Sequence, residues 1–560
     1  MDLNQNYLFI NQYLFDKGHI SEIEVNQTYT ANYPVVYILY NLKSKLAYVG
    51  ESTNVIGRMG NHLANPDKKN LKYVFIISSP YFNKSAALDI ESYLIKYMTA
   101  DNSFSLLNGN AGISEHNYYQ KRSYFEIFEN IWDNLKLEKV VAKDILDIDN
   151  SDLFKYSPYK SLSHDQNKAI FKYLNILSTQ QEESCVFIEG CAGTGKTILA
   201  VYLIKLLTST LDIDDIDKSN TEMYEKLKKV DEVKGLHGDL QIALVVPMVS
   251  LRKTLKNVFR SVHGLSANMV IGPSDVLKKD YDLLIVDEAH RLKRREGITN
   301  YKSFDDANKK LGLGNKGTEL DWIRRRSKHQ IFFYDDAQSI RPSDIPKETY
   351  FELKSESCTI KLTSQMRVNA GVDYIKFIHH LLTKKYSESL KSFENINYDL
   401  KLYTNLSDMV KDLESKENLY GLTRMMAGYS WKWVSRTTNT PDAIIDGEEM
   451  TWNKEPHDWI NSTTEMTEMG CIHTTQGYDL NYGGVIFGHE ITYNEETCKI
   501  EVIKENYFDS KGKVGVHDIN RLHDYIINIY KTLMYRGIKG TYVYCCDKKL
   551  ESYFKSYIPS

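Results

Sequence analysis

The sequence is poor in the residues that break or link folded domains, with 11 prolines and 30 glycines among 560 residues. No stretch is rich in proline or in glycine and serine, so composition marks no flexible linker. Hydrophobic residues make up 42% of the chain and charged residues 26%, which excludes a disordered chain, a collagen-like repeat and a coiled-coil rod. At about 150 residues per domain, this length indicates roughly three or four globular units.

Disulfide and zinc frameworks are also missing from the sequence. The seven cysteines form no C-x-x-C pair and no cluster with histidine at zinc-ligand spacing. No apolar run approaches the roughly 20 residues that cross a bilayer, and the first residues lack the basic segment and apolar core of a signal peptide. We therefore expect a reduced, cytoplasmic protein without a membrane partner.

The charge total does not reveal a partner. A net charge of −4 neither indicates nor excludes nucleic acid, because a basic groove can lie within a balanced total. The short basic runs at 293–295 and 324–326 are interpreted as solvated faces, with phosphate contact as the alternative. Trp431 and Trp433 are interpreted as packing residues, with base stacking as the alternative. Function must therefore be inferred from motifs.

The first hundred residues have the pattern of a small α+β domain. Residues 35–50 predict two strands joined by a short turn, and residues 54–63 predict a short helix that ends before Pro66. Residues 73–77 predict a third strand, and a longer helix begins at Lys84. These elements precede a polar, helical stretch that we interpret as a connector.

From residue 161 onward, short apolar runs alternate with longer helical segments. Such alternation is typical of a parallel α/β sheet with helices on its faces. Two polar or irregular spans, at about 209–239 and 384–468, interrupt the alternation and are expected to be insertions. The predicted divisions are a small α+β domain at 1–115, a helical connector at 116–160, and two parallel-sheet α/β lobes at 161–345 and 346–560.

Residues 190–197 have the sequence GCAGTGKT and match the phosphate-binding pattern G-x-x-x-x-G-K-[ST]. The pattern follows a predicted strand and opens an apolar helix, which is its usual context. Glycines let backbone amides turn toward phosphate, Lys196 would reach the β- and γ-phosphates, and the Thr197 hydroxyl would bind Mg²⁺. The residues predicted to bind ATP and Mg²⁺ here are Gly190, Gly193, Gly195, Lys196 and Thr197.

A second motif, LLIVDEAH at 283–290, ends an apolar strand with two acids. At such a strand end, Asp287 can hold Mg²⁺ and Glu288 can orient or deprotonate the attacking water. Either motif alone could arise by chance. Together they predict ATP hydrolysis.

The acidic tetrad resembles motif II of superfamily 1 and 2 helicases. Other segments resemble superfamily 1 motifs in the same order, over residues 161–560. The resemblance implies two RecA-like lobes, with Gln166 reading adenine and Gln338 in motif III, where Tyr334 replaces the usual glycine. The matching segments are Asp165–Gln166, Val245–Leu251, Asp335–Gln338, Gln365–Arg367, His473–Asp479 and Tyr535–Gly537.

Two arginines carry the catalytic part of this resemblance. It implies that Arg367 and Arg536 approach the γ-phosphate when the lobes close. Because phosphoryl transfer is catalysed mainly by positioned positive charge, such closure couples hydrolysis to motion. Residues 421–433 and the ending YRGIKGTYVYC resemble a bacterial branch of the superfamily related to the helicase domain of Schlafen proteins.

Residues 35–112 resemble a different family, the GIY-YIG nucleases. Val35–Tyr37 and Tyr48–Gly50 resemble the two strand motifs that name the family, although the first lacks its glycine and isoleucine. Arg58 and His62 are four residues apart and therefore share one face of the predicted helix. They match the family's arginine, which steadies the scissile phosphate, and its accompanying histidine.

Glu91 lies in the apolar stripe of its predicted helix, where a carboxylate is costly without a cation or donors. In the family this position is the single ligand of Mg²⁺ or Mn²⁺, and Asn108 matches a late asparagine. The resemblance implies that Arg58 stabilises the phosphorane and that Tyr37 takes a proton from water. A phenol is a poor base at neutral pH, so Arg58 or the metal must favour the phenolate. Packing tyrosines and a salt-bridged Glu91 are the alternatives.

The two sets of residues predict an ATP-dependent nuclease-helicase that acts on DNA rather than RNA, in bacterial anti-phage defence. An ATP switch that gates the nuclease without unwinding is one alternative, and DNA repair or RNA-directed cleavage is another. One such nuclease domain makes one nick per site, so a double-strand break needs two copies or two events. The sequence does not decide between a monomer and a homo-oligomer. The sequence identifies no accessory defence protein.

Overall fold

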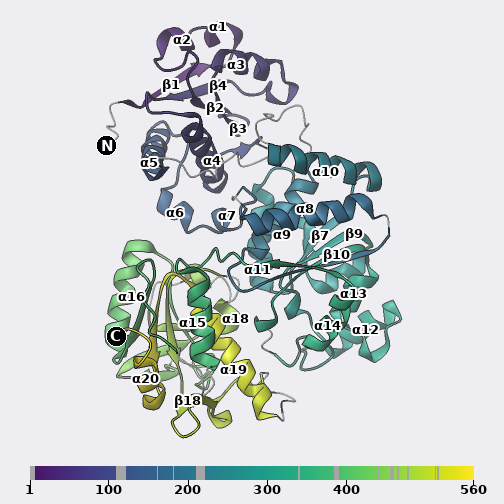
Figure 1. Cartoon of the computed structure of the whole chain (residues 1–560), viewed down its shortest axis with the longest axis vertical. Coiled ribbons are helices and arrows are strands. Elements are labelled where there is room, and N and C mark those ends of the chain that lie inside the picture. Colours follow the sequence, from purple (N-terminus) through teal and green to yellow (C-terminus); the bar gives the residue numbers. More distant parts are fainter. Residues whose placement is uncertain are drawn as a thin grey trace. The chain divides into compact units, whose positions relative to one another are not determined.

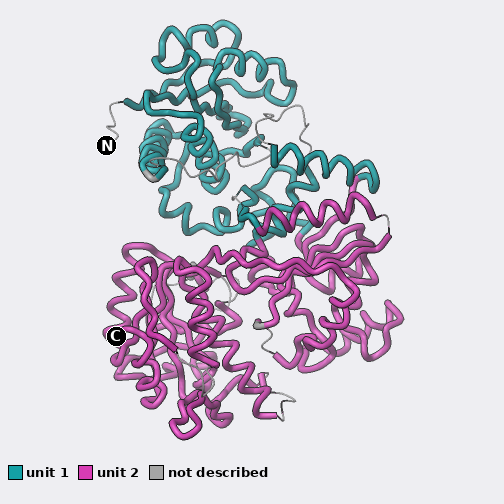
Figure 2. Tube along the Cα trace, in the orientation of Figure 1, with its two compact units in different colours: residues 1–164, 198–238, 254–269 teal, residues 165–197, 239–253, 270–560 magenta. Residues whose placement is uncertain are grey.

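The computed structural model describes residues 7–108, 121–159, 162–180, 182–209, 221–338, 341–383, 390–438, 440–454, 459–462, 466–475, 478–510, 512–513, 516 and 518–560. The chain forms two compact units, which Figure 2 distinguishes by colour. Unit 1 comprises residues 1–164, 198–238 and 254–269, and unit 2 comprises residues 165–197, 239–253 and 270–560. The domain boundaries predicted from the sequence stay predictions.

Unit 1 contains a five-stranded sheet in the order β1-β4-β2-β3-β5. Neighbouring strands in this sheet run antiparallel, except for β3 and β5, which run parallel to each other. The predicted hairpin and third strand are confirmed as β2, β3 and β4, whereas β1 and β5 were not predicted. The strands are β1 Phe9–Leu14, β2 Val35–Asn41, β3 Leu46–Ser52, β4 Tyr73–Ser78 and β5 Ser105–Leu106.

Two helices of unit 1 carry predicted site residues. α3 begins after Asn54, whose side chain accepts a hydrogen bond from the Gly57 amide, and ends before Pro66, as predicted. α4 contacts α5, α6 and α7, so the polar helical stretch packs onto the small domain. The helices are α1 Lys17–Ile20, α2 Ile23–Asn26, α3 Val55–Ala64, α4 Lys84–Asp101, α5 Lys121–Leu137, α6 Ile145–Asp149 and α7 Asp152–Lys155, with a 3₁₀ turn at Pro66–Lys68.

The first sheet of unit 2 has six parallel strands in the order β11-β6-β10-β9-β7-β8. The apolar runs that predicted a parallel sheet form its central strands (Figure 1). β11 pairs with β6, so this sheet extends past residue 345, where the first lobe was expected to end. The strands are β6 Ser184–Gly190, β7 Ile242–Val245, β8 Val270–Ile271, β9 Tyr281–Val286, β10 Ser327–Tyr334 and β11 Cys358–Leu362.

Several helices accompany this sheet along the chain. The chain passes from one unit to the other near the start of α8 and within α9 and α11. The helices are α8 His164–Thr179, α9 Lys196–Leu207, α10 Thr221–His237, α11 Val249–Ser261, α12 Tyr301–Leu311, α13 Glu319–Arg325 and α14 Lys347–Ser355, with 3₁₀ turns at Ala267–Met269, Pro273–Lys278, Ala289–Arg291, Gly314–Lys316 and Asp336–Gln338.

The second sheet of unit 2 has seven strands in the order β12-β20-β17-β13-β16-β15-β14, and only β14 is antiparallel to its neighbour. The span at 384–468, expected as an insertion, was misjudged: its described residues supply β12 to β15, which belong to the sheet itself. Polar residues in β12 and β15 hid this in the sequence. The strands are β12 Asp399–Tyr403, β13 Thr423–Ala427, β14 Ala443–Ile445, β15 Glu448–Trp452, β16 Glu468–Gly470, β17 Leu480–Phe487 and β20 Gly537–Cys545; β18 Ile491–Asn494 and β19 Lys499–Val502 form a separate hairpin.

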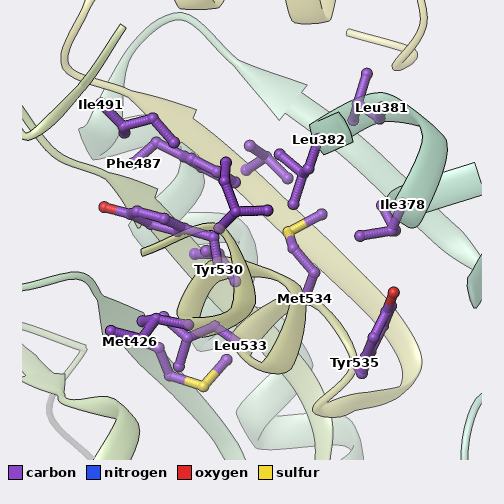
Figure 3. Close-up of a cluster of buried hydrophobic side chains, with 14 of the residues drawn as sticks. Ile378, Leu381, Leu382, Met426, Phe487, Ile491, Tyr530, Leu533, Met534 and Tyr535 are labelled. Atoms are coloured by element: carbon purple, nitrogen blue, oxygen red, sulfur yellow. The ribbon is translucent and has the colours of Figure 1, made fainter. Parts of the chain in front are cut away.

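A dense apolar core holds the second sheet and its helices together (Figure 3). Tyr530 of α19 stacks on Phe487 of β17, with ring centroids 4.2 Å apart. Leu533, Met534 and Ile378 fill the same core.

No described helix is both long and apolar enough to cross a membrane. The helices are α15 Gly371–Thr383, α16 Leu406–Tyr420, α17 Trp459–Ser462, α18 Ile472–Thr475, α19 Ile519–Met534 and α20 Lys548–Lys555, with a 3₁₀ turn at Lys504–Asn506.

Candidate active sites

The first candidate site lies in unit 1 around the hydroxyl group of Tyr37. Tyr37 is fully buried on β2, and the hairpin register pairs it with Gly50 on β3. A Cβ atom on Gly50 would lie 2.3 Å from the Tyr37 hydroxyl oxygen. Only glycine therefore leaves room for the phenol at this position.

The helix α3 presents its two predicted residues to this hydroxyl group. The His62 Nε2 atom lies 2.8 Å from Tyr37 Oη, and Arg58 Nε donates a hydrogen bond to the same oxygen at 3.4 Å. Tyr48 completes the group, with its ring centroid 5.0 Å from that of His62 and 6.4 Å from that of Tyr37. The structure therefore brings together four of the residues predicted for the nuclease.

Lys68 also belongs to this cluster and was not predicted. Its Nζ atom lies 2.9 Å from His62 Nδ1, and it also lies 3.6 Å from the centre of the Tyr48 ring. Burial, with the charges of Lys68 and Arg58, lowers the pKa of His62 to about 3, so the imidazole is neutral. An ammonium group can only donate, so Nδ1 accepts and Nε2 carries the proton. His62 is therefore a hydrogen-bond donor to Tyr37.

The phenol of Tyr37 is protonated in this resting arrangement. Burial, followed by the neighbouring Tyr48, raises the pKa of Tyr37 well above its ordinary value, and Arg58 opposes that shift. Two donors nevertheless point at the oxygen, from Arg58 and His62. The oxygen is thus prepared to carry negative charge once a proton has left.

Glu91 lies half-buried on α4, on the carboxyl side of the hairpin in sequence. Its charge contributes to the raised pKa of Tyr37, so its field reaches the hydroxyl group. Among the described residues, no three His, Cys, Asp or Glu side chains form a metal cluster. A single carboxylate with water and phosphate oxygens is a donor set that suits Mg²⁺, which keeps much of its hydration. Glu91 fits such a site.

The structure places Asn108, one of the predicted site residues, against the backbone of β3. Its Oδ1 accepts a hydrogen bond from the Val49 amide at 3.0 Å, and its Nδ2 donates to the Val49 carbonyl at 2.8 Å. Val49 stands between Tyr48 and Gly50 on β3. The buried amide group therefore holds the strand that carries both of these residues.

The second candidate site lies in unit 2, where the loop after β6 forms the phosphate-binding turn. Gly193 and Gly195 have φ angles of +85° and +75°, a region that favours glycine. Gly190 is needed for space instead, because a Cβ atom there would lie 2.3 Å from Thr194 Oγ1. At each of the three predicted positions in this loop, the backbone geometry or the space available thus explains why the residue is glycine.

The polar side chains of this site converge on the loop. Thr197 Oγ1 donates to Asp287 Oδ2 at 2.7 Å, which joins the two predicted Mg²⁺ ligands. Lys196 Nζ donates to the Gly190 carbonyl at 2.6 Å and lies 3.7 Å from Asp335. Gln338 Nε2 donates a hydrogen bond to the same Asp335 oxygen, Oδ2, at 2.5 Å. Oxygen donors of this kind suit Mg²⁺.

The two acids of the D-E-A-H tetrad sit in unlike environments. Burial and the adjacent Glu288 raise the pKa of Asp287, although Thr197 opposes the shift. Burial acts the same way on Glu288, but His290, 2.8 Å away, and Lys196 hold its pKa below the ordinary range. Glu288 also has a φ of 52°, which turns its carboxylate out of the strand. An ionised Glu288 is suited to accept a hydrogen bond from water.

Two glutamines contact the phosphate loop from either side. Gln166 is fully buried, and its Nε2 donates to the Thr194 carbonyl at 2.9 Å. Gln365 Nε2 donates to the Ala192 carbonyl at 2.8 Å, and the Met366 amide donates to the Gly193 carbonyl at 2.8 Å. The segment that carries Arg367 is therefore docked on the loop.

Both predicted arginines are held by two consecutive residues. Arg367 Nε lies 2.5 Å from Asp479 Oδ1, and the buried Arg536 donates to the Tyr478 carbonyl at 3.2 Å. Gln476 and Gly477 of the same predicted motif lie outside the described residues. The guanidinium groups thus rest against the end of that motif.

Sequence reasoning missed Lys68, the spatial role of Gly50 and the contacts of Gln365. Lys68 follows Pro66 in a 3₁₀ turn, where no periodicity relates it to His62. The contacts of Gln365 link segments that lie 173 residues apart. Only the fold brings such residues together.

Two family profiles match the chain. The profile described as "Schlafen group 3, DNA/RNA helicase domain" matches residues 183–547, which is more than half of the chain. The profile described as "GIY-YIG catalytic domain" matches residues 33–103. Both resemblances noted in the sequence are confirmed, as is the fold class: a small α+β nuclease domain followed by two RecA-like parallel-sheet lobes. A GIY-YIG catalytic domain and a DNA/RNA helicase domain make the chain an enzyme.

Individual relatives are more distant. An uncharacterised protein of Saccharomyces cerevisiae, YPL245W, is 26% identical over 399 residues, which cover 65% of this chain and 82% of the yeast protein. An arterivirus nonstructural protein 10 helicase is 11% identical with a TM-score of 0.28, over 68% of this chain and 64% of that one. The Pif1 helicase of Bacteroides with ADP-AlF3 and ssDNA is 12% identical with a TM-score of 0.24, over 69% of this chain and 92% of that one.

Proposed function

Because the chain belongs to the Schlafen group 3 DNA/RNA helicase domain family and carries a GIY-YIG catalytic domain, we propose that it is an ATP-dependent nuclease-helicase acting on DNA. The proposal is supported by one observation: Arg58 and His62 meet at the Tyr37 hydroxyl in unit 1, and Thr197 and Asp287 meet beside the phosphate loop in unit 2. A nuclease coupled to a motor in this way suits anti-phage defence in bacteria, which is the biological role we propose.

In the nuclease, Tyr37 acts as a phenolate: it first loses its own proton to bulk water, and the phenolate then takes a proton from the attacking water. Arg58 and His62 donate hydrogen bonds to its oxygen and so stabilise the phenolate that proton transfer needs. Arg58 also offers positive charge to the phosphorane. Glu91 would hold Mg²⁺ or Mn²⁺, which when bound supplies Lewis acidity at the scissile phosphate and the leaving oxygen.

In the ATPase, Lys196 exchanges its loop carbonyls for the β- and γ-phosphates of ATP. Thr197 and Asp287 would hold Mg²⁺, which when bound neutralises charge on those phosphates. Glu288 accepts a hydrogen bond from the attacking water. Arg367 and Arg536 leave the 478–479 segment and stabilise the charge of the transferring phosphoryl group.

Separate loss of the two activities tests the proposal. Glu91→Gln is expected to lower plasmid nicking by at least about 100-fold, because it removes the carboxylate that binds the metal, and to leave ATP hydrolysis unchanged. Lys196→Ala is expected to abolish ATP hydrolysis and to keep basal nicking. The measurement uses supercoiled plasmid with Mg²⁺, with and without ATP, alongside phosphate release. Loss of both activities in either variant would refute two independent sites.

Lys68→Met is expected to slow nicking by at least about tenfold, because His62 then loses the partner that keeps its proton on Nε2. ATP hydrolysis should not change. Lys69→Met, one residue later and exposed, is the matched control and should cleave normally. Single-turnover nicking rates against pH measure both variants. Equal rates for the two variants would remove Lys68 from the mechanism.

A second candidate function is an ATP switch that gates the nuclease without unwinding. The docking of Arg367 on Asp479, and of the Gln365 segment on the phosphate loop, favours this alternative, because ATP must rearrange both before it can be hydrolysed. Strand displacement on a forked duplex separates the two functions. A motor displaces the strand only with ATP, whereas a switch shows ATP-dependent nicking without displacement.

A further inference from the structure

A surface in the second lobe carries exposed aromatic rings beside positive charges. It consists of Lys432, Trp433 and Arg436, from the loop after β13, together with Phe508, and is called the aromatic-basic surface below. Trp433 and Phe508 are 37% and 36% exposed. The Arg436 guanidinium lies 5.4 Å from the centre of the Trp433 ring, and Lys432 Nζ lies 6.0 Å from that of Phe508.

The two segments of this surface are joined by backbone and by packing. The Phe508 amide donates to the Tyr429 carbonyl at 2.8 Å, and the Tyr429 and Tyr507 rings meet edge to face at 6.1 Å. Trp431, in contrast, is half-buried and lies 6.3 Å from the Trp452 ring, so it packs as the sequence interpretation expected. Trp433 is more exposed, at 37%, which favours the stacking alternative for this residue. These contacts hold in place the two segments that carry the exposed rings.

The charges near these rings favour an anion. Residues 428–438 contain two cations and no acid. The nearby Asp442 is occupied by backbone amides, since it accepts from Ser435 at 2.8 Å and from Trp452 at 2.6 Å. Asp509, next to Phe508, is turned toward His473, 3.8 Å away. The positive charges of the loop thus remain available to a ligand.

A ligand that combines flat, apolar faces with regularly spaced negative charge is a single strand of nucleic acid. Bases stack on exposed aromatic rings with little sequence preference, and phosphates pair with lysine and arginine. From this match we infer that the aromatic-basic surface binds single-stranded nucleic acid. The inference rests on the proposed function, because it supplies the track on which the motor would act.

The surface is also connected to the nucleotide site. The Tyr429 hydroxyl donates to Cys471 Sγ at 3.4 Å, just before α18, and the Tyr429 ring lies 5.8 Å from that of His473. His473 in turn lies 3.2 Å from Arg341 Nε, in the first lobe. The same segment leads to Asp479, which holds Arg367. A strand on this surface is therefore linked through a few contacts to an arginine of the ATP site.

The chain offers a matched control. Arg295 lies 5.2 Å from the centre of the Tyr301 ring, and Tyr301 is 42% exposed, so this pair has the same geometry as Arg436 and Trp433. However, both oxygens of Asp305 neutralise Arg295, at 2.5 and 2.9 Å. Tyr301→Ala should leave nucleic-acid binding unchanged.

Fluorescence anisotropy with a labelled oligodeoxythymidylate of about 20 nucleotides tests the inference on the full-length protein. Trp433→Leu and Phe508→Leu are each expected to weaken binding by about tenfold, since each removes one stacking ring, and Trp433→Phe is expected to retain most of the affinity. Arg436→Ala should lower the slope of log affinity against log salt by about one. A parallel series with oligouridylate reports whether the sugar matters.

The outcomes are distinct. Equal binding by the unaltered protein, Trp433→Leu and Phe508→Leu would overturn this inference and leave the proposed function standing. Absence of binding by the unaltered protein to either oligonucleotide would overturn both. Weakening by Tyr301→Ala as large as that by Trp433→Leu would also count against this surface, because it would show that any exposed ring contributes.

Discussion

Gly50→Ala is expected to lower plasmid nicking by about 10²- to 10⁴-fold, which is the contribution of a positioned general base. A methyl group at this position would lie 2.3 Å from Tyr37 Oη, so the phenol must leave the place where Arg58 and His62 donate to it. Glu91, the proposed metal ligand, and Arg58, the arginine proposed to bind the phosphate, are not substituted. Single-turnover nicking measures the effect, and ATP hydrolysis should be unchanged.

The control is Gly60→Ala, in the same domain. Gly60 lies in α3, and a Cβ atom there would meet nothing within 4 Å. Alanine in an exposed helix interior should raise stability by about 0.5–1 kcal/mol and leave nicking intact. Normal nicking by Gly50→Ala, with a thermal unfolding midpoint like that of the unaltered protein, would contradict the role given to Tyr37.

Arg367→Ala is expected to lower the rate of ATP hydrolysis by about 1,000-fold while ATP binding persists. A guanidinium group that reaches the transferring phosphoryl group stabilises the transition state more than bound ATP. Phosphate release and binding of a fluorescent ATP analogue separate the two steps. Basal nicking should continue, because Glu91 and Tyr37 are untouched.

An arginine in an ordinary ion pair provides the comparison for Arg367. Arg326 Nη1 lies 2.9 Å from Asp280, and both side chains are accessible to solvent. Surface pairs of this kind contribute little, so Arg326→Ala should hydrolyse ATP normally. A hydrolysis rate for Arg367→Ala within about threefold of that for Arg326→Ala would exclude a role of Arg367 at the phosphate.

Local spacing predicted much of both sites. The four-residue interval placed Arg58 and His62 on one face of α3, and the glycine pattern placed Lys196 and Thr197 at the start of a helix. These relations depend on backbone geometry within a few residues. They can therefore be predicted from a single sequence.

Contacts between residues that lie far apart in the sequence could not be predicted. Asn108 meets Val49 from 59 positions away, and β5 forms only because residues 105–106 reach β3. Strands β12 and β15 of the second sheet carry polar residues at their partly exposed positions, so their composition resembles that of loops. Tertiary pairing, rather than local preference, makes these segments part of the fold.

The attachment of both arginines to Tyr478 and Asp479 has a thermodynamic consequence. Two consecutive residues move together, so a ligand that displaces this segment breaks both of these contacts in one step. If ATP recruits both arginines, as proposed, it must work against the same two contacts, and a second ligand that has already broken them raises the affinity for ATP. Reciprocity then requires that ATP strengthen the binding of that second ligand by the same factor. The pair of contacts therefore sets an energetic coupling between whatever binds near α18 and the nucleotide.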